Sequence, residues 1–255
     1  MIKSEPMKRV AVAGATGRIG SLTVTALRAA GHEVVEISRA RGVDLQSGAG
    51  LADVLSGVDA VIDSTNTPAQ DTDEVVGFFT TVTANLLAAE ARVGVGHHVV
   101  LSIVGLTEPA KSAHYAGKLA QEAAVAAGPI PWTLVRATQF FDFAALVVSW
   151  TEQNGAAAIA PLLVQPIAPA NVAAALAEVA VGAAQHRHLD IAGPDTQDLV
   201  DMARRTLAVR GHLVRLVPTW DGPFNVEMAG NVLLPGPETR IMPTTFDEWL
   251  AAGAN

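Results

Sequence analysis

The chain has 255 residues, of which 50% are hydrophobic and only 16% are charged, and its formal net charge is −8. This composition is typical of helices packed on a buried sheet and excludes a disordered chain. An acidic chain with few lysines is unsuited to binding the phosphate backbone of DNA or RNA, so we expect no nucleic-acid partner. Because cysteine is absent, disulfides and thiolate chemistry are excluded, which fits a cytoplasmic protein.

The sequence predicts no membrane segment. Its first residues carry scattered charges and no continuous apolar run, so we expect no signal peptide. The most apolar long stretch, 156–184, is interrupted by prolines and polar residues, so we expect no membrane span.

The first half of the chain alternates short apolar runs with helical periodicity. Residues 9–13 predict a strand that ends in a glycine turn, and a helix follows until Gly31. Further strands are predicted at 33–38, 58–64, 97–105 and 132–137, with a very short one at 42–45. Helices are predicted at about 49–56, 72–93 and 112–127. Repeated β-α-β units of this kind build a parallel sheet covered on both faces, so the predicted fold class is α/β.

The pattern loosens after residue 138. Helices are predicted at 140–150, 171–184 and 198–211, and a strand at 188–193. From Val214 on, prolines and glycines leave only fragments. Since no repeat and no long linker separates the two parts, we expect a single domain over 1–255. Its core spans about 8–137, and a C-terminal lobe of about 138–255 partly rejoins the sheet.

The segment GATGRIG at 14–20 lies between the first predicted strand and helix. Gly14, Gly17 and Gly20 allow the backbone to turn tightly and to approach a pyrophosphate, whose charge the free N–H groups of the helix would meet. A glycine-rich turn alone is a weak signal, but its place at the first crossover of a β-α-β series favours a dinucleotide site.

The end of the second predicted strand indicates which dinucleotide binds. A carboxylate there would bind ribose hydroxyls, whereas arginine attracts a 2′-phosphate. The sequence places Ser38, Arg39 and Arg41 at this point, and the glycine turn adds Arg18. The nearest acid, Glu36, lies inside the strand. These residues favour NADP(H) over NAD(H).

Four segments occur in an order that resembles a known family: GATGRIG at 14–20, VVLSIVG at 99–105, HYAGKLAQE at 114–122 and PWTLVRATQFFDF at 131–143. In this order the chain resembles the atypical or extended short-chain dehydrogenase/reductases, and it is most similar to their NmrA-like NAD(P)-binding branch. The resemblance implies a Rossmann-type doubly wound parallel sheet with a small C-terminal substrate lobe.

The resemblance also implies cofactor contacts. The adenine edge would meet Asp44 and Leu45, and the segment after the 58–64 strand would contribute Ser64, Thr65 and Asn66. Lys118 would bind the nicotinamide ribose. With the glycine turn and the arginine segment, the expected cofactor-binding residues are Gly14, Thr16, Gly17, Arg18, Ile19, Gly20, Ser38, Arg39, Asp44, Leu45, Ser64, Thr65, Asn66 and Lys118.

Members of this family use a serine, together with a tyrosine four residues before a lysine, and the lysine lowers the pKa of the phenol. Ser102 and Lys118 match this pattern, but His114 occupies the tyrosine position and Tyr115 lies three residues before the lysine. On a helix, both flank Lys118. Three interpretations stay open: Tyr115 donates the proton, His114 donates it, or the protein binds NADP(H) with little catalysis.

Phe140 and Phe141 follow the 132–137 strand, and they could wall a substrate pocket beyond the strand ends. Packing in the core of the next helix is the competing interpretation. The adjacent His97 and His98 point to opposite faces of a strand, and no ligand set for a metal is evident, so no metal is predicted.

Two functions are compatible with the sequence. The first is an NADP(H)-dependent oxidoreductase acting on a small carbonyl or quinone-like substrate, with direct hydride transfer. The second is a catalytically weak NADP(H)-binding redox sensor. The expected partner is a small molecule, and either a monomer or a homodimer fits the sequence.

Overall fold

A computed structural model describes residues 6–106 and 112–254. Its central sheet has seven strands in the order β12-β9-β5-β4-β3-β1-β2. The strands are β1 (Arg9–Ala13), β2 (Glu33–Ile37), β3 (Ala60–Asp63), β4 (His97–Ile103), β5 (Trp132–Ala137), β9 (His188–Ala192) and β12 (Arg240–Ile241). The chain moves outward from β1 in both directions, and β1 pairs in parallel with both β2 and β3. This arrangement confirms the predicted α/β, doubly wound parallel sheet.

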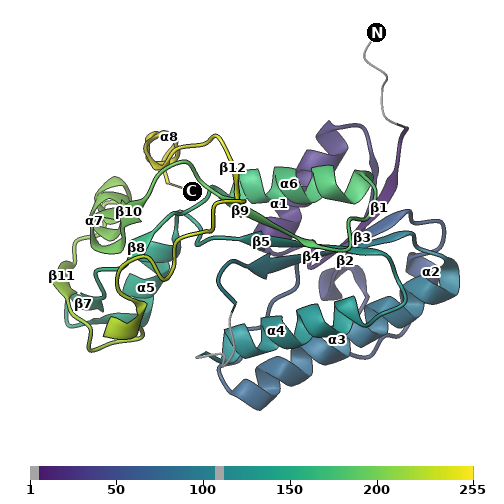
Figure 1. Ribbon diagram of the computed structural model, residues 1–255, viewed down its shortest axis with the longest axis horizontal. Helices are drawn as coiled ribbons and strands as arrows, with labels where there is room; N and C mark the ends of the chain where they lie inside the picture. The colour runs from purple at the N-terminus through teal and green to yellow at the C-terminus, as the bar shows by residue number, and fades with distance from the viewer. Residues whose placement is uncertain (1–5, 107–111, 255) are drawn as a thin grey trace, which may run out of the picture. The chain divides into compact units, whose positions relative to one another are not determined.

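The chain divides into two compact units. The first comprises Met1–Arg136 with Val172–Leu189, and the second comprises Ala137–Asn171 with Asp190–Asn255. The helices of the first unit are α1 (Arg18–Ala29), α2 (Leu51–Val54), α3 (Thr72–Val93), α4 (Ala113–Ala126) and most of α6 (Pro169–Val181), with a 3-10 turn η1 (Arg39–Arg41). Helices α3 and α4 cover one face of the sheet, and α1 and α6 cover the other (Figure 1).

Helices α3 and α4 lie side by side along their lengths (Figure 1). Asp71 caps the start of α3 by accepting hydrogen bonds from the backbone of Asp73 and Glu74, and Gly94 ends it in a left-handed conformation. A Cβ atom on Gly117 of α4 would stand 2.6 Å from the ring of Phe79. The glycine therefore permits the close approach that brings the next residue of α4, Lys118, against α3.

The second unit has its own core and two small sheets. Its elements are α5 (Phe143–Thr151), β6 (Glu152–Gln153), β7 (Ala156–Ile159), β8 (Leu163–Val164), β10 (Gln197–Asp198), α7 (Leu199–Val209), β11 (Arg215–Pro218), a 3-10 turn η2 (Val226–Met228) and α8 (Phe246–Ala251). One sheet has the order β11-β7-β6, and the other pairs β10 with β8. Aromatic rings fill its core, where Phe141 packs against Phe246 and Trp249.

The predicted elements of the first half occur within a few residues of their expected bounds, except the strand at 42–45. There the chain forms turns, because Gly42 takes a left-handed conformation after η1. In the second half, the short strands β6, β7, β8, β10, β11 and β12 and the helix α8 were not predicted. No helix in the described part of the chain is long and apolar enough to cross a membrane.

Candidate functional site

The glycine turn connects β1 to α1 at the carboxyl edge of the sheet. Gly14 has a φ of +78°, and a Cβ on Gly20 would stand 2.1 Å from the carbonyl oxygen of Gly14. Gly14 N–H and Ala15 N–H donate to the carbonyl of Ile37, which holds the turn against the end of β2. Gly17 is the N-cap residue of α1, and it provides no side-chain hydrogen bond to the first turn of the helix. The turn thus leaves the N-terminus of a helix open to an anion.

The end of β2 carries both signs of charge. Glu36 accepts hydrogen bonds from Arg28 at 2.7 Å and Arg41 at 3.1 Å. These two guanidinium groups lower the pKa of Glu36, which keeps it ionised. Arg39 is exposed, and its guanidinium has no partner among residues 6–106 and 112–254. Of the two arginines after β2, Arg39 is therefore the one available to a ligand.

Ser38 separates Glu36 from Arg39 along the chain. Its side chain is buried, and its Oγ has no hydrogen-bond partner among the described residues. Buried hydroxyls are normally hydrogen-bonded, so an unpaired one beside the glycine turn fits a ligand that supplies the missing partner.

The segment expected at the adenine edge is held in place by α3. The side-chain amide of Asn85 donates hydrogen bonds to the carbonyls of Leu45 and Gln46, both at 2.9 Å. Asp44 is exposed, and its carboxylate accepts from the N–H of Gln46. The role of Asn85 could not be predicted from the sequence, because a polar residue on a long helix is usually solvated.

Residues 64–66 follow β3 at the same edge as the glycine turn. Ser64 Oγ donates to the carbonyl of Ala13 at 2.8 Å, so its hydroxyl ties β3 to β1. Thr65 is buried and donates from both its N–H and its Oγ1 to Asp63 Oδ1, at 2.9 and 2.6 Å. Asn66 is exposed. Of the three, Asn66 is the most accessible to a ligand.

Lys118 is buried and takes part in a chain of hydrogen bonds. Its Nζ donates to the carbonyl of Leu101 on β4 and to Oε1 of Gln121, both at 2.9 Å. The Nε2 of Gln121 donates to Oδ2 of Asp63 at 2.9 Å. Nζ also lies 4.4 Å from the centre of the Phe79 ring. Burial lowers the pKa of Lys118 to about 8, and the carboxylates of Asp63 and Glu122 act against this shift.

His114 and Tyr115 both occupy the first turn of α4, and both are half-buried. The His114 ring packs edge-on against Phe79, with 6.0 Å between ring centres. Burial, together with the charge of Lys118, lowers the pKa of His114 to about 4. Burial raises the pKa of Tyr115. Lys118 donates its hydrogen bonds to Leu101 and Gln121.

The remaining expected residues fall into separate environments. Ser102 on β4 is 2% exposed, and its Oγ has no partner among the described residues. Phe141 is 1% exposed and packs in the core of the second unit, so core packing accounts for its ring. Phe140 is half-buried and forms an isolated bridge with Ile167. Of the two rings, only Phe140 is accessible to a substrate.

His97 and His98 each lie within hydrogen-bond distance of another side chain. His97 Nε2 lies 2.9 Å from Thr133 Oγ1, and His98 Nδ1 lies 2.8 Å from Glu90 Oε1. Within residues 6–106 and 112–254, no three histidine or acidic side chains gather in a way that could hold a metal ion.

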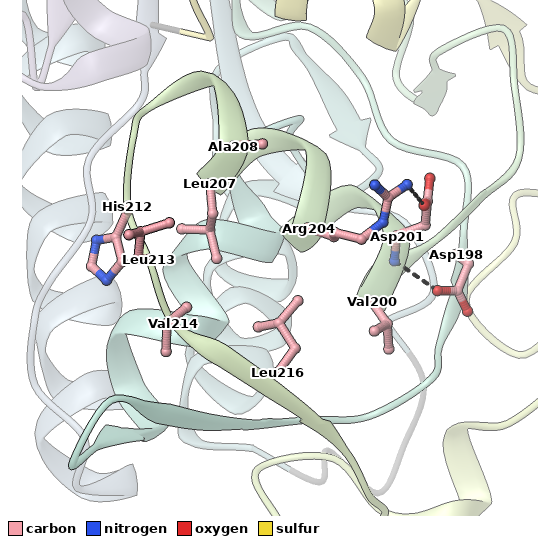
Figure 2. A pocket seen from close by; sticks show the side chains of 10 residues that line it. All are labelled: Asp198, Val200, Asp201, Arg204, Leu207, Ala208, His212, Leu213, Val214 and Leu216. Atoms are coloured by element: carbon pink, nitrogen blue, oxygen red, sulfur yellow. Dashed lines mark hydrogen bonds and ion pairs between the residues drawn. The ribbon is translucent and has the colours of Figure 1, made fainter.

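A hollow of about 590 Å³ lies within the second unit, between α7 and β11. Leu207, Val214 and Leu216 point into it, while Arg204 and Asp201 form an ion pair at its rim (Figure 2). None of the residues expected from the sequence to bind cofactor or substrate lines this hollow.

The residues of the first unit fit a dinucleotide on their own geometry. The cradle at Gly14 and Gly20 has no room for side chains, and α1 presents an uncapped N-terminus. Ser38 and Ser102 add buried hydroxyls that no described residue satisfies. The sequence identified all of these positions, but it missed Asp63, Gln121 and Asn85, which hold the neighbouring residues in place. For Gln121, the spacing of three residues from Lys118 on one helix was the available signal.

Comparison with known proteins agrees with this geometry. A family model described as NAD(P)H-binding matches residues 14–181, more than half of the chain. No curated protein matches. An NADPH-dependent quinone oxidoreductase from Escherichia coli is 18% identical, with a TM-score of 0.68, over 96% of this chain and 100% of that one.

Two further solved structures share the fold. The triphenylmethane reductase from Citrobacter sp., complexed with NADP(H), is 20% identical, with a TM-score of 0.61, over 83% of this chain and 79% of that one. A short-chain dehydrogenase/reductase superfamily protein from Agrobacterium tumefaciens with bound NAD is 19% identical, with a TM-score of 0.69, over 96% of both chains. At these identities, the likeness shows the fold.

Proposed function

The chain belongs to the NAD(P)H-binding family, and from this premise we propose that it is an NADP(H)-dependent oxidoreductase acting on a small carbonyl or quinone-like compound. The observation that carries the proposal is a buried lysine, Lys118, at the end of the sheet where the glycine turn opens α1 to an anion. Similar structures named as an NADPH-dependent quinone oxidoreductase and a triphenylmethane reductase support a reductase.

NADP(H) is the preferred cofactor in this proposal. Glu36, the acid nearest to the end of β2 along the chain, is held by Arg28 and Arg41. Arg39 is exposed beside it and could pair with a 2′-phosphate. Because one structure of the same fold contains NAD, the fold alone does not decide between the two cofactors, and the preference depends on Arg39.

The bound nicotinamide would supply hydride to the substrate, and the chain's own groups would hold the cofactor and supply a proton. The N-terminus of α1 would bind the pyrophosphate, and Lys118 would donate to the nicotinamide ribose. At neutral pH the phenol of Tyr115 holds its proton, whereas His114, with a pKa of about 4, is almost never an imidazolium. Tyr115 is therefore the better proton donor of the two.

A redox sensor with little catalysis is the second candidate, and one observation favours it. Lys118 donates to Leu101 and Gln121, and burial raises the pKa of Tyr115, so the phenol lacks the activation that the resemblance implies. A phenol with a raised pKa transfers its proton more slowly to a weakly basic substrate oxygen.

The experiment that tests the proposal combines binding with turnover. NADPH affinity is measured by calorimetry, and NADPH oxidation is followed over a panel of aldehydes, ketones and quinones, for wild type and Lys118→Ala. If the ammonium of Lys118 binds the nicotinamide ribose, each of its hydrogen bonds should contribute about 1.5–3 kcal/mol to the free energy of NADPH binding. The oxidoreductase proposal expects Lys118→Ala to weaken binding and abolish turnover together. Tight NADPH binding without turnover on any compound supports the sensor instead.

A further inference from the structure

Lys118, Gln121, Asp63 and Thr65 form one continuous chain of hydrogen bonds from α4 to the segment after β3. The Gln121 side chain is its middle link, because Oε1 accepts from Lys118 while Nε2 donates to Asp63. Asp63 then accepts two hydrogen bonds from Thr65. The chain therefore joins two elements that the proposed function assigns to cofactor binding.

The members of this chain are buried. Gln121 and Asp63 are 0% exposed, and Lys118 is 5% exposed. Burying an ammonium and a carboxylate is unfavourable unless they are paired, and here an amide that bonds to both separates them. The polarised amide lets each charge stabilise the other through it. The network thus holds a cation in an apolar setting, against the Phe79 ring.

The charged groups that act on Lys118 come from two elements. Asp63 on β3 and Glu122 on α4 favour its ammonium form, while burial disfavours that form. Helix α3 contributes the Phe79 ring, and β4 contributes the carbonyl of Leu101. Two further titratable groups, His114 and Tyr115, lie on the preceding turn of α4. The lowered pKa of His114 keeps it neutral at neutral pH, and the raised pKa of Tyr115 does the same for the phenol. Asp63 itself lies near the buried His98.

We propose that Gln121 and Asp63 are positioning residues, which fix Lys118 beside the segment after β3 and keep its ammonium charged when the cofactor binds. The inference rests on the proposed function for the role of Lys118. It assigns no contact with the cofactor to Gln121 or Asp63. Their effect on binding passes through the charge and position of the lysine.

Two isosteric variants test the inference because they change the charge next to Lys118 in opposite directions. Asp63→Asn removes the carboxylate, so the lysine should lose its proton at lower pH. Gln121→Glu places a carboxylate directly on Nζ, so the lysine should keep its proton to higher pH. Asp53→Asn, an exposed residue of α2 in the same unit, is the control for loss of one negative charge.

The first readout is the titration of Lys118 itself, followed by NMR of protein labelled with ¹³C at lysine Cε. Lys118→Ala identifies its signal among the few lysines of the chain. The second readout is NADPH affinity between pH 6 and 9. We expect the Lys118 midpoint to move down in Asp63→Asn and up in Gln121→Glu, with the affinity following it. At a pH above both the wild-type and the displaced midpoint, each pH unit of displacement in Asp63→Asn corresponds to about a tenfold loss of affinity.

The possible failures are distinguishable. A Lys118 midpoint that stays the same in both variants, or moves equally in Asp53→Asn, overturns the inference about Gln121 and Asp63. The midpoints could instead move as expected while NADPH affinity stays unchanged. This result would support the hydrogen-bond network but would contradict the placement of Lys118 in the cofactor site, and with it the proposed function. A purely structural role would lower the stability of the variants without opposite shifts in the lysine titration.

Discussion

Gly20 lies so close to Gly14 that a Cβ atom on Gly20 would stand 2.1 Å from the carbonyl oxygen of Gly14. This contact joins the first turn of α1 to the end of β1, and it requires the absence of a side chain at Gly20. The open N-terminus of α1 depends on the same contact, because a side chain there would push the helix away from the strand. The three glycines are therefore not equivalent, since a Cβ on Gly17 would meet the same oxygen at 3.2 Å.

We expect Gly20→Ala to lower the free energy of unfolding by about 1–3 kcal/mol, because overpacking against a backbone atom forces the helix to shift. NADPH affinity should fall as well, since the pyrophosphate would meet a displaced helix N-terminus. Chemical denaturation and calorimetric titration measure the two effects. Gly77→Ala in α3 is the matched control, because a Cβ there meets nothing within 4 Å.

Alanine is the better helix former, so Gly77→Ala should raise the free energy of unfolding by about 0.5–1 kcal/mol. If Gly20→Ala proves as stable as wild type and binds NADPH equally well, the tight contact between α1 and β1 has no consequence for the site.

Replacing Arg39 tests the choice of cofactor. Arg39→Asp removes one charge-assisted contact with a 2′-phosphate and adds a repulsion, so NADPH binding should weaken by about 1.5–3 kcal/mol or somewhat more. NADH carries no 2′-phosphate and should be affected less. Calorimetric titration with both nucleotides measures the difference.

Arg92→Asp, an exposed residue in the last turn of α3, is the control for the same change of charge. An equal loss of NADPH affinity in the two variants would show that only the overall charge of the protein affects binding, and that Arg39 has no specific role.

Two substitutions in the first turn of α4 identify the proton donor. Tyr115→Phe and His114→Phe each keep an aromatic ring and remove the exchangeable proton. Because burial lowers the pKa of His114 to about 4 and raises the pKa of Tyr115, we expect only Tyr115→Phe to reduce turnover. A positioned acid contributes about 10²–10⁴-fold, so the loss in kcat should lie in that range with little change in NADPH affinity. Intact turnover in Tyr115→Phe would rule out the phenol as donor.

The sequence predicted those features that residues close together in the chain determine. It did not predict features that depend on a contact with a residue distant in the chain. The glycine turn and the buried strands of the first half follow from chain periodicity, and Gly14, Gly17 and Gly20 occur where expected. The resemblance implied that Lys118 lowers the pKa of a phenol beside it, and the spacing along the helix left Tyr115 and His114 open as the proton donor. The lysine bonds instead to Gln121 and to Leu101, a residue of β4 that only tertiary structure brings within reach.

The short strands of the second unit were missed for a related reason. Pairs such as β10 with β8 consist of two residues each, and they form between segments more than 30 residues apart. Segments of this length have no periodicity to detect. For Phe141 the sequence left a pocket wall and core packing open, and the ring lies among Phe246 and Trp249, which are also distant in sequence.

The buried pair of His98 and Glu90 should make stability depend on pH. Burial acts to lower the pKa of His98, but the carboxylates of Glu90 and Asp63 together more than offset this, and the pKa is raised. A raised pKa in the folded state contributes stability that is fully present below the unfolded value of about 6.5 and is lost as the pH rises through the folded value. Breaking a buried pair costs about 3–5 kcal/mol.

We therefore expect Glu90→Gln to lower the free energy of unfolding by an amount near the lower end of that range at pH 6, and by less at pH 9. Urea denaturation at the two pH values measures the difference. Glu74→Gln, an exposed residue in the first turn of the same helix, should cost less than about 1 kcal/mol at either pH. A Glu90→Gln penalty that is the same at pH 6 and pH 9 would show that Glu90 does not raise the pKa of His98 in the folded protein.

The most direct test of the whole account is the affinity of the unmodified protein for NADPH and for NADH, measured side by side by calorimetric titration. The account expects both to bind at one site per chain, and NADPH to bind more tightly because Arg39 is available to the 2′-phosphate while Glu36 is held by Arg28 and Arg41. NADH binding as tightly as NADPH would contradict the assignment of Arg39, and no binding of either nucleotide would contradict the central claim that this chain works through NADP(H).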